Sequence, residues 1–128
     1  MIKGIGIDIV SIERIEKMLI RWESKFINKV FTEDEINYCQ SKTQRASHFA
    51  VRFAAKEAAY KVLGNYLDVL RWREIEVAKQ ESGKPFLRLH GKTLSVSQDN
   101  GIDILHISLS HGKEYAVAQI VGEGKENK

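Results

Sequence analysis

The sequence has few of the residues that cross-link a chain. Its 128 residues include one cysteine, Cys39, and one proline, Pro85. A lone cysteine excludes a disulfide within the chain, and no CxxC or histidine spacing accompanies it, so a structural zinc site is not expected. We interpret Cys39 as a small buried apolar residue.

Long hydrophobic runs are also missing. The N-terminal stretch MIKGIGIDIV is apolar, but Asp8 interrupts it. The stretch is too short and too polar for a signal peptide or a membrane span. We therefore expect a cytoplasmic protein without a membrane segment.

No linker, internal repeat or low-complexity block divides the chain. A length of 128 residues, with 43% hydrophobic and 29% charged residues, fits one domain with a modest core. We expect this domain to span residues 1–121 and the polar tail 122–128 to remain unpacked. The net charge of +3 and the pI near 9.0 are compatible with phosphate-bearing ligands or an acidic partner.

The first half of the chain shows helical patterns. Apolar residues recur at helical spacing over 12–22, and residues 44–63 contain no helix breaker, which predicts a long central helix. Between them, Thr32 and Glu35 form the pattern of a capping box, which predicts a short helix ending near Cys39.

The second half of the chain shows strand patterns, so the predicted class is α+β with an antiparallel sheet late in the sequence. A first strand is expected at the N-terminus over 3–10. Alternating apolar residues and two turn sequences predict the rest: strands over 74–79, 86–89, 102–110 and 114–121, and a short helix over 92–98.

The stretch RFAAKEAAYK, residues 52–61, places an acid between two lysines of the long helix. At about 100° per residue, Glu57 and Lys61 share one face, whereas Lys56 lies on a separate flank. An exposed ion pair between Glu57 and Lys61, contributing about 0.3–0.5 kcal/mol, would explain the pattern. The alanines around Glu57 also leave room for a ligand, or for tight packing against a strand.

The first strand offers a second acid. In GIGIDIV, alternation puts Gly4, Gly6 and Asp8 on one face. Glycines within a strand often mark the close approach of another backbone or of a ligand, so both interpretations are open for Asp8. Ser11 is available to cap the following helix, so Asp8 is not needed there. GxG without a third glycine or a βαβ frame is not a dinucleotide fingerprint.

If Asp8 and Glu57 meet, their like charges repel unless a cation or a proton intervenes. Mg²⁺ takes one or two carboxylates together with waters and substrate phosphates. Lys61, one helical turn beyond Glu57, would then hold a phosphate oxygen. The pattern suggests a phosphate-handling metal site if the fold brings the two acids together.

The segment ISLSH places His111 at a strand end beside a glycine turn. There it either lies on the surface or reaches into a cleft. Ser110 points to the opposite face of the strand and no GxSxG motif is present, so a nucleophilic serine–histidine pair is not predicted.

The helix over 12–22 has a basic side opposite its core positions. This side carries Arg14, Lys17, Met18 and Arg21. It is either a solvated face or a docking face for an acidic amphipathic helix, because methionine adapts to apolar surfaces and arginine binds carboxylates.

The segment 102–109 carries Ile and Leu on both faces of a strand. A small single sheet does not readily bury that much apolar surface. We expect oligomerisation to cover it.

Two other function classes fit parts of the pattern. Arg45, Arg52, Lys56 and Lys61 lie on one helix, as in a nucleic-acid-binding module without catalysis. Their dispersal around the helix, and the lack of a strand with interleaved aromatics, argue against it. A non-catalytic trimeric scaffold explains the apolar sheet but not Asp8 beside two glycines.

Four stretches, in this order and at this spacing, resemble the short bacterial holo-[acyl-carrier-protein] synthases, a branch of the 4'-phosphopantetheinyl transferases: GIGIDIV, RFAAKEAAYKVLG, ESGKPFLRLHG and ISLSH. The resemblance runs from about Ile2 to Val121 and implies the 4'-phosphopantetheinyl transferase-like fold. It implies Mg²⁺-dependent transfer of the phosphopantetheine arm of coenzyme A to a serine of apo-acyl carrier protein, in fatty acid biosynthesis. The resemblance also implies that adenosine 3',5'-bisphosphate is released. It implies a homotrimer with active sites between its subunits.

The resemblance also assigns roles to residues. It makes Asp8 and Glu57 the metal ligands, and Lys61 the third member of the catalytic group. The base for the serine is Glu57 or a water molecule. The coenzyme A contacts implied are Lys61, His111, Arg52, Arg45, Gly83 and Pro85. The carrier-protein contacts implied are Arg14, Met18 and Arg21.

Overall fold

The computed structural model describes residues 1–126. In chain order its elements are β1 (Ile2–Ser11), α1 (Ile12–Val30), α2 (Glu33–Gln40), α3 (Arg45–Leu63), η1 (Trp72–Glu74), β2 (Ile75–Lys79), β3 (Pro85–Leu89), α4 (Gly91–Asp99), β4 (Ile104–His111) and β5 (Tyr115–Glu123). The α+β class is confirmed. None of the helices described over 1–126 is both long and apolar enough to cross a membrane.

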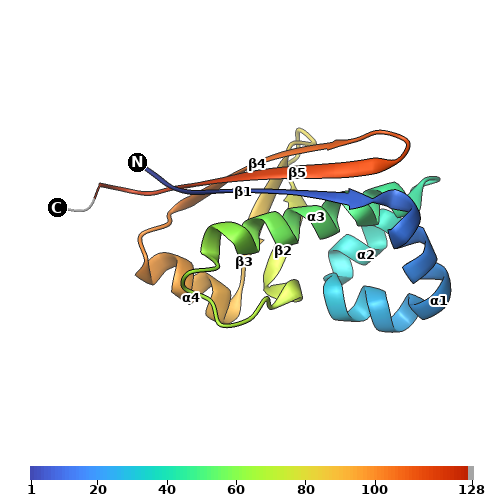
Figure 1. Cartoon of the computed structure of the whole chain (residues 1–128), viewed down its shortest axis with the longest axis horizontal. Coiled ribbons are helices and arrows are strands. Elements are labelled where there is room, and N and C mark those ends of the chain that lie inside the picture. Colours follow the sequence, from blue (N-terminus) through green and yellow to red (C-terminus); the bar gives the residue numbers. More distant parts are fainter. Residues whose placement is uncertain (127–128) are drawn as a thin grey trace.

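The strands form two antiparallel sheets. One sheet has the order β1-β5-β4, and β2 pairs with β3 in the other. In Figure 1 the helices lie on one side of the three-stranded sheet, and α3 runs directly beneath it. The other sides of α3 contact α1, α2 and β2. This helix is therefore the centre of the core.

Small residues allow α3 to take this central place. Along residues 45–63 neither proline nor glycine interrupts the helix, and alanine has the highest helix propensity. The buried alanines of the helix are Ala50, Ala54, Ala55, Ala58 and Ala59. Because these side chains are short, strands and helices approach the α3 backbone closely.

The first helix, α1, is longer than its pattern predicts. The spacing predicts an end at Trp22, but the helix continues to Val30 across a break at Trp22, whose φ of −127° and ψ of 17° are not helical. Ile15 and Leu19 are buried as predicted, whereas Trp22 is 46% exposed. The break turns this indole away from the core, so its assignment to the buried stripe is wrong.

The predicted end of the folded region at residue 121 is also wrong. Strand β5 continues to Glu123, whose carbonyl accepts from Asp103 N at 2.9 Å. Gly124 N then donates to Met1 O at 3.0 Å. Backbone groups pair in a sheet whatever the polarity of their side chains, so a polar composition does not mark an end of pairing. The last part of the predicted tail, residues 127–128, lies outside the described residues.

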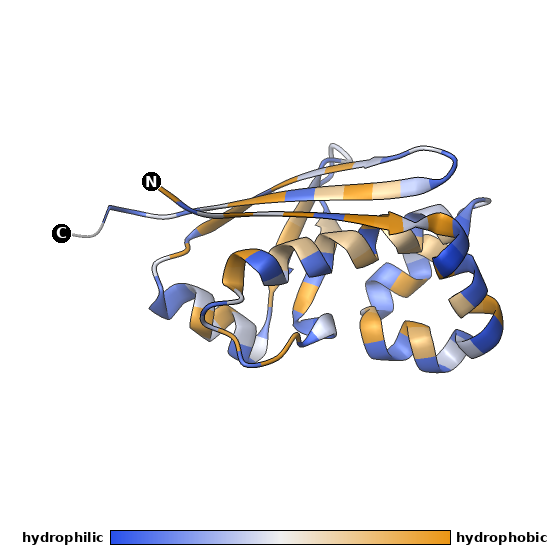
Figure 2. Ribbon diagram, in the orientation of Figure 1, coloured by the Kyte–Doolittle hydropathy of each residue, from blue (hydrophilic) through white to orange (hydrophobic). Residues whose placement is uncertain are grey.

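Strand β1 presents an apolar face to solvent. Ile5, Ile7 and Ile9 are 63%, 57% and 62% exposed. Val121 and Val117 of β5 pair with Ile5 and Ile9 and extend this face. Figure 2 shows apolar residues along β1 and β5, in the layer of the molecule away from the helices.

The prediction of a two-sided apolar strand over 102–109 is only partly right. On β4, Ile104 is 51% exposed, but the next outward positions are the polar His106 and Ser108. Leu105 and Ile107 pack against the core. The uncovered apolar surface exists, but β1 carries most of it.

Candidate active site

Strand β1 and helix α3 meet closely at a glycine. A Cβ atom on Gly6 would lie 2.0 Å from the carbonyl oxygen of Ala58, and one on Gly4 would lie 3.2 Å from Val62 Cγ1. The two glycines therefore serve helix packing. Asp8 follows on the same face of the strand, where it reaches the far end of this contact.

Asp8 has one oxygen without a partner. Lys61 Nζ lies 3.2 Å from Asp8 Oδ1 and donates to the carbonyl oxygen of Ile7 at 2.7 Å. Asp8 Oδ2 is buried and has no hydrogen-bond partner among residues 1–126. Ser11 caps α1 by accepting from Arg14 N at 3.3 Å, so Asp8 does not serve as the cap. Because buried carboxylate oxygens normally have partners, Oδ2 is suited to receive a ligand.

Glu57 is the second acid of this region. Burial raises its pKa, the charge of Asp8 raises it further, and Arg14 and Lys61 act in the opposite direction. Lys61, one helical turn from Glu57 on the same face of α3, contacts Asp8 at 3.2 Å, so Glu57 lies on the side of the helix that meets β1 near Asp8. Within the described residues Glu57 makes no ion pair, and Lys61 pairs with Asp8 instead. The exposed Glu57–Lys61 pair that the spacing allowed is therefore not formed.

These two acids fit a magnesium ion. Carboxylate oxygens are hard ligands, and Mg²⁺ is usually held by one or two of them while it keeps waters and phosphate oxygens. An unpartnered oxygen on Asp8 lies beside Glu57, and a divalent cation would relieve the repulsion between the two charges. Over residues 1–126, no group of three or more His, Cys, Asp or Glu side chains is placed to hold a metal.

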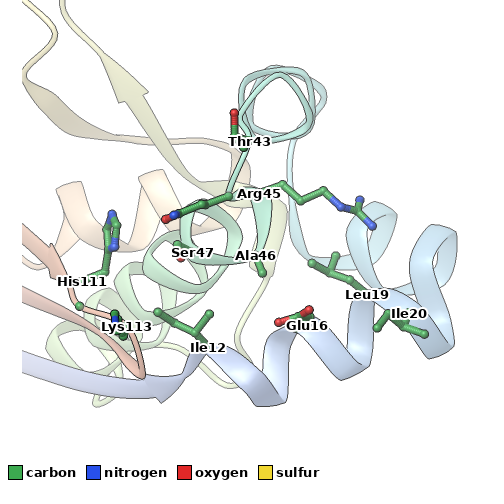
Figure 3. Close-up of a pocket in the computed structure, with 12 residues that line it drawn as sticks. Ile12, Glu16, Leu19, Ile20, Thr43, Arg45, Ala46, Ser47, His111 and Lys113 are labelled. Carbon is green, nitrogen blue, oxygen red and sulfur yellow. The ribbon is translucent and has the colours of Figure 1, made fainter.

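A cavity of about 800 Å³ lies beyond the end of β1, and both His111 and Arg45 line it. Figure 3 shows His111 on the side of the β4–β5 turn, and Arg45 pointing away from it, towards α1. Arg45 Nη1 is held there by Glu23 Oε1 at 2.9 Å and Gln40 Oε1 at 2.7 Å. The structure thus brings the histidine and the arginine to one cavity, with the guanidinium already paired.

His111 lies on the same face of the sheet as Asp8. The register pairs His111 with Ala116 and Ala116 with Val10, and Val10 is one alternation step from Asp8. Ser110 faces the opposite side, so the prediction that the serine and the histidine point apart is confirmed.

Arg52 is buried, with 3% of its surface exposed. Its guanidinium lies 4.4 Å from the centre of the Tyr38 ring, and its Nε is buried without a partner in the described part of the chain. Arg52, Tyr38 and Lys79 line a cavity of about 270 Å³. Burial acts to raise the pKa of Tyr38, but the hydrogen bond and charge of Lys79 lower it overall.

Sequence reasoning missed the ring that joins these two cavities. The His48 ring lies 5.7 Å from the Tyr38 ring and 5.9 Å from the His111 ring. Burial lowers the pKa of His48, and the nearby positive charge of Arg52 lowers it further. The sequence places His48 one helical turn before Arg52 on the same face of α3, and this spacing was the signal that pointed to His48.

Gly83 and Pro85 line neither the cavity of His111 and Arg45 nor that of Arg52. Gly83 occupies the turn between β2 and β3 with a φ of +89°, a conformation that favours glycine, and Pro85 begins β3. In residues 1–126 no hydrogen bond or ring contact connects this turn to Asp8 or Glu57. One chain does not bring all the predicted site residues together.

The basic side of α1 forms a groove of about 440 Å³, lined by Ser11, Glu13, Arg14, Lys17, Met18, Arg21 and Trp22. Arg14 and Arg21 are exposed, and Arg21 stacks on Trp22 at 4.9 Å. Met18 is half-buried and packs against the core, so it is less exposed than the pattern predicts. The groove is apolar at its base and basic at its rim.

The interpretation of α3 as a basic nucleic-acid-binding helix is wrong. Lys56 is fully buried and Arg52 nearly so. Phosphates of a nucleic acid need accessible cations, and two of the four basic side chains on this helix cannot reach them.

Comparison with known proteins identifies the family of this chain. Residues 4–120 match the family model described as the 4'-phosphopantetheinyl transferase superfamily. The holo-[acyl-carrier-protein] synthase of Halothermothrix orenii is 45% identical over 123 residues, which cover 96% of this chain and 98% of that protein.

Two similar solved structures contain ligands. The Bacillus anthracis holo-(acyl-carrier-protein) synthase, described in complex with CoA (3',5'-ADP), is 38% identical with a TM-score of 0.77, covering 98% of this chain and 99% of that one. The Helicobacter pylori enzyme in complex with coenzyme A is 34% identical with a TM-score of 0.80, covering 93% and 99%. On this evidence, the chain belongs to the 4'-phosphopantetheinyl transferase superfamily.

Proposed function

We propose that this protein is a holo-[acyl-carrier-protein] synthase. It transfers the 4'-phosphopantetheine group of coenzyme A to a serine of apo-acyl carrier protein, in fatty acid biosynthesis, and acts as a single catalytic domain in the cytoplasm. The observation that carries the proposal is the unpartnered oxygen of Asp8 beside Glu57, in a chain that shares 45% identity with a synthase over nearly its whole length.

Asp8 and Glu57 would hold Mg²⁺ between strand β1 and helix α3. The ion supplies positive charge to the pyrophosphate oxygens of coenzyme A when it is bound. The two side chains come from different elements, and the Gly6–Ala58 contact sets the spacing between those elements.

Lys61 and Glu57 act on the reacting groups. The serine oxygen forms a bond to the β-phosphorus of coenzyme A, and the bond from that phosphorus to the bridging oxygen breaks, which releases adenosine 3',5'-bisphosphate. Lys61, already held at Asp8 and the Ile7 carbonyl, offsets the charge that develops on the leaving bisphosphate. Glu57, or a water molecule it binds, accepts the serine proton.

The nucleotide of coenzyme A would occupy the cavity that His111 and Arg45 line. Arg52 faces a smaller cavity, which the row of rings through His48 connects to the larger one. Gly83 and Pro85 would contact the nucleotide from the β2–β3 turn of a neighbouring subunit, since they line neither of these cavities in their own chain.

A homotrimer would supply that neighbour. Support comes from the uncovered face of β1, where Ile5, Ile7 and Ile9 are each more than half exposed. Contiguous exposed apolar surface of this kind marks association sites. Sedimentation equilibrium should give three times the chain mass, and Ile7→Glu should give a folded monomer with little activity. A wild-type monomer that is fully active would contradict the trimer.

The main test of the proposed function is mass spectrometry of the carrier protein. Incubation of this protein with apo-acyl carrier protein, coenzyme A and Mg²⁺ should add one phosphopantetheine to the carrier. Asp8→Ala and Glu57→Ala should abolish the increment while circular dichroism stays that of the wild type. A folded wild-type protein that leaves the carrier unmodified would rule out the synthase reaction.

The groove on α1 would bind the acidic carrier protein through Arg14, Met18 and Arg21. Its apolar base and basic rim match an acidic amphipathic helix. Arg21→Glu should raise the KM for carrier protein far more than the KM for coenzyme A. Lys29→Glu makes the same charge change on α1 outside the groove, so it should alter neither KM. Equal effects of the two variants would contradict docking in the groove.

A further inference from the structure

Lys56, the residue directly before Glu57, is completely buried. Its ammonium donates to Glu35 Oε1 at 2.7 Å, to the Trp72 carbonyl at 2.9 Å and to the Ile75 carbonyl at 2.6 Å. An ammonium has three donors, so all of them are used. The three acceptors come from α2, from η1 and from the start of β2.

Glu35 extends this arrangement to further elements. Its Oε1 also accepts from Thr32 N at 2.8 Å, and its Oε2 accepts from Val77 N at 2.8 Å. The carboxylate therefore joins the capped start of α2 to the middle of β2, and Lys56 joins both to α3. Every polar atom of the ion pair has a partner, so its hydrogen bonds fix the orientation of both side chains.

Two contacts thus hold α3 from different sides. Gly6 and Ala58 set how closely β1 approaches the helix, and Lys56 sets how the helix is turned about its own axis. A glutamate carboxylate lies roughly 6 Å from a helix axis, so a rotation of about 10° would move it by about 1 Å. A displacement of about 1 Å at a reacting site is enough to cost about 10²-fold in rate.

We propose that Lys56 is a positioning residue for Glu57, an inference that rests on the proposed function. The buried ion pair with Glu35 turns α3 so that the Glu57 carboxylate faces the open oxygen of Asp8. A well-packed apolar residue would fill the same space without this directional bonding. The pair therefore contributes the geometry of the metal site in addition to packing.

The test compares metal binding in folded variants. Lys56→Met alone leaves Glu35 buried without a counter-ion, so the main variant is the double substitution Lys56→Met/Glu35→Gln. The double substitution removes both buried charges together, and the amide oxygen still accepts from one of the two backbone N–H groups that Glu35 serves. Mn²⁺ affinity is measured on the protein without coenzyme A by electron paramagnetic resonance, and folding by thermal melting and circular dichroism.

The double variant should remain folded, bind Mn²⁺ about tenfold or more weakly, and lose about 10²-fold in kcat. Raising the Mg²⁺ concentration should recover part of the rate, and the KM for carrier protein should stay within about twofold, because the α1 groove is unchanged. A purely structural role predicts a lower melting temperature with wild-type Mn²⁺ affinity, and that result would overturn the inference.

Asp8→Ala separates this inference from the proposed function. If the wild type and Asp8→Ala bind Mn²⁺ equally, the metal site itself is wrong and the role of Lys56 falls with it. If Asp8→Ala loses binding while the folded double variant keeps it, the metal site stands and only the role of Lys56 is refuted. If both lose binding, the inference is supported.

Discussion

Two acidic centres lie on different sides of α3, and their carboxylates have different surroundings. On one side Glu35 is 1% exposed, and its oxygens accept from Thr32 N, Lys56 and Val77 N. On the other side Glu57 is half-buried without a hydrogen bond in the described residues, beside an oxygen of Asp8 that has none either.

This difference separates structural acids from those available for chemistry. The Glu35 carboxylate can be fully buried because both of its oxygens accept hydrogen bonds. Glu57 and Asp8 combine partial burial with missing partners, which costs stability and leaves capacity to bind a cation. Neutral substitutions at the two centres should therefore have opposite effects on folding and activity.

The largest effect is expected at the Glu57 centre. Glu57→Gln keeps the shape of the side chain but removes its charge, so the rate of carrier modification should fall by about 10³-fold. The melting temperature of the metal-free protein should stay equal or rise, because repulsion from Asp8 is removed. Initial rates and calorimetry measure both. A large loss of stability without loss of rate per folded molecule would reverse the assignment.

At the Glu35 centre the effect should fall on stability. Glu35→Gln leaves the Lys56 ammonium buried without an anion, which should cost about 3–5 kcal/mol in the free energy of unfolding. Adding Lys56→Met should recover most of this loss. Urea denaturation of the two variants measures the difference, and equal stability of the single and double variants would show that the pair is not coupled.

Alanine substitutions at Gly6 and Gly4 test how closely β1 must approach α3. Gly6→Ala places a Cβ 2.0 Å from a carbonyl oxygen and should cost about 2 kcal/mol or more, together with much of the activity. Gly4→Ala meets Val62 Cγ1 at 3.2 Å and should cost less, since a side chain adjusts more readily than a backbone. Unfolding experiments on both rank the two sites, and equal costs would contradict the close contact at Gly6.

The smallest expected effect is in the pH dependence of stability, measured with a chelator present. The raised pKa of Glu57 contributes stability at low pH that is lost as pH rises through the folded-state pKa. Glu76 has the opposite sign. Burial acts to raise its pKa, but hydrogen bonds from Thr32 and His90 lower it overall, so its stability contribution is lost as pH falls through the folded-state pKa.

Between about pH 4 and pH 7, these signs predict that Glu57→Gln gains stability relative to the wild type as pH rises. Glu76→Gln should lose stability relative to the wild type as pH rises from about 3 to about 5, because its lowered pKa confines the change to pH values below the ordinary glutamate pKa of about 4.3. Urea midpoints at several pH values measure both slopes. Slopes of the same sign would contradict the contrast between the two acids.

Much of the fold could be predicted because its signals are local. The capping box at Thr32 and Glu35 forms as its pattern indicates, and alternation correctly places Gly6 and Asp8 on one face of β1. The errors arise where distant contacts override local pattern. Trp22 keeps helical spacing but leaves the core at a break, and Glu123 pairs with the backbone of Asp103 despite its polar setting.

The site divides in the same way. Residue type and spacing predicted Asp8, Glu57 and Lys61 as candidate site residues, but they did not predict the burial of Arg52 or the row of rings through His48. Those features depend on α2 and on the β2–β3 sheet, which are distant in the sequence. Helical spacing gives the direction of a side chain but not the neighbour it meets.

By itself the sequence determined the order of helices and strands and the face of its own strand or helix on which each acid lies, because periodicity and caps depend on near neighbours. Only the tertiary structure decided that Lys56 is a buried partner of Glu35 while the adjacent Glu57 faces Asp8. The physical reason is that consecutive helical residues point about 100° apart, so packing against different elements gives them different surroundings.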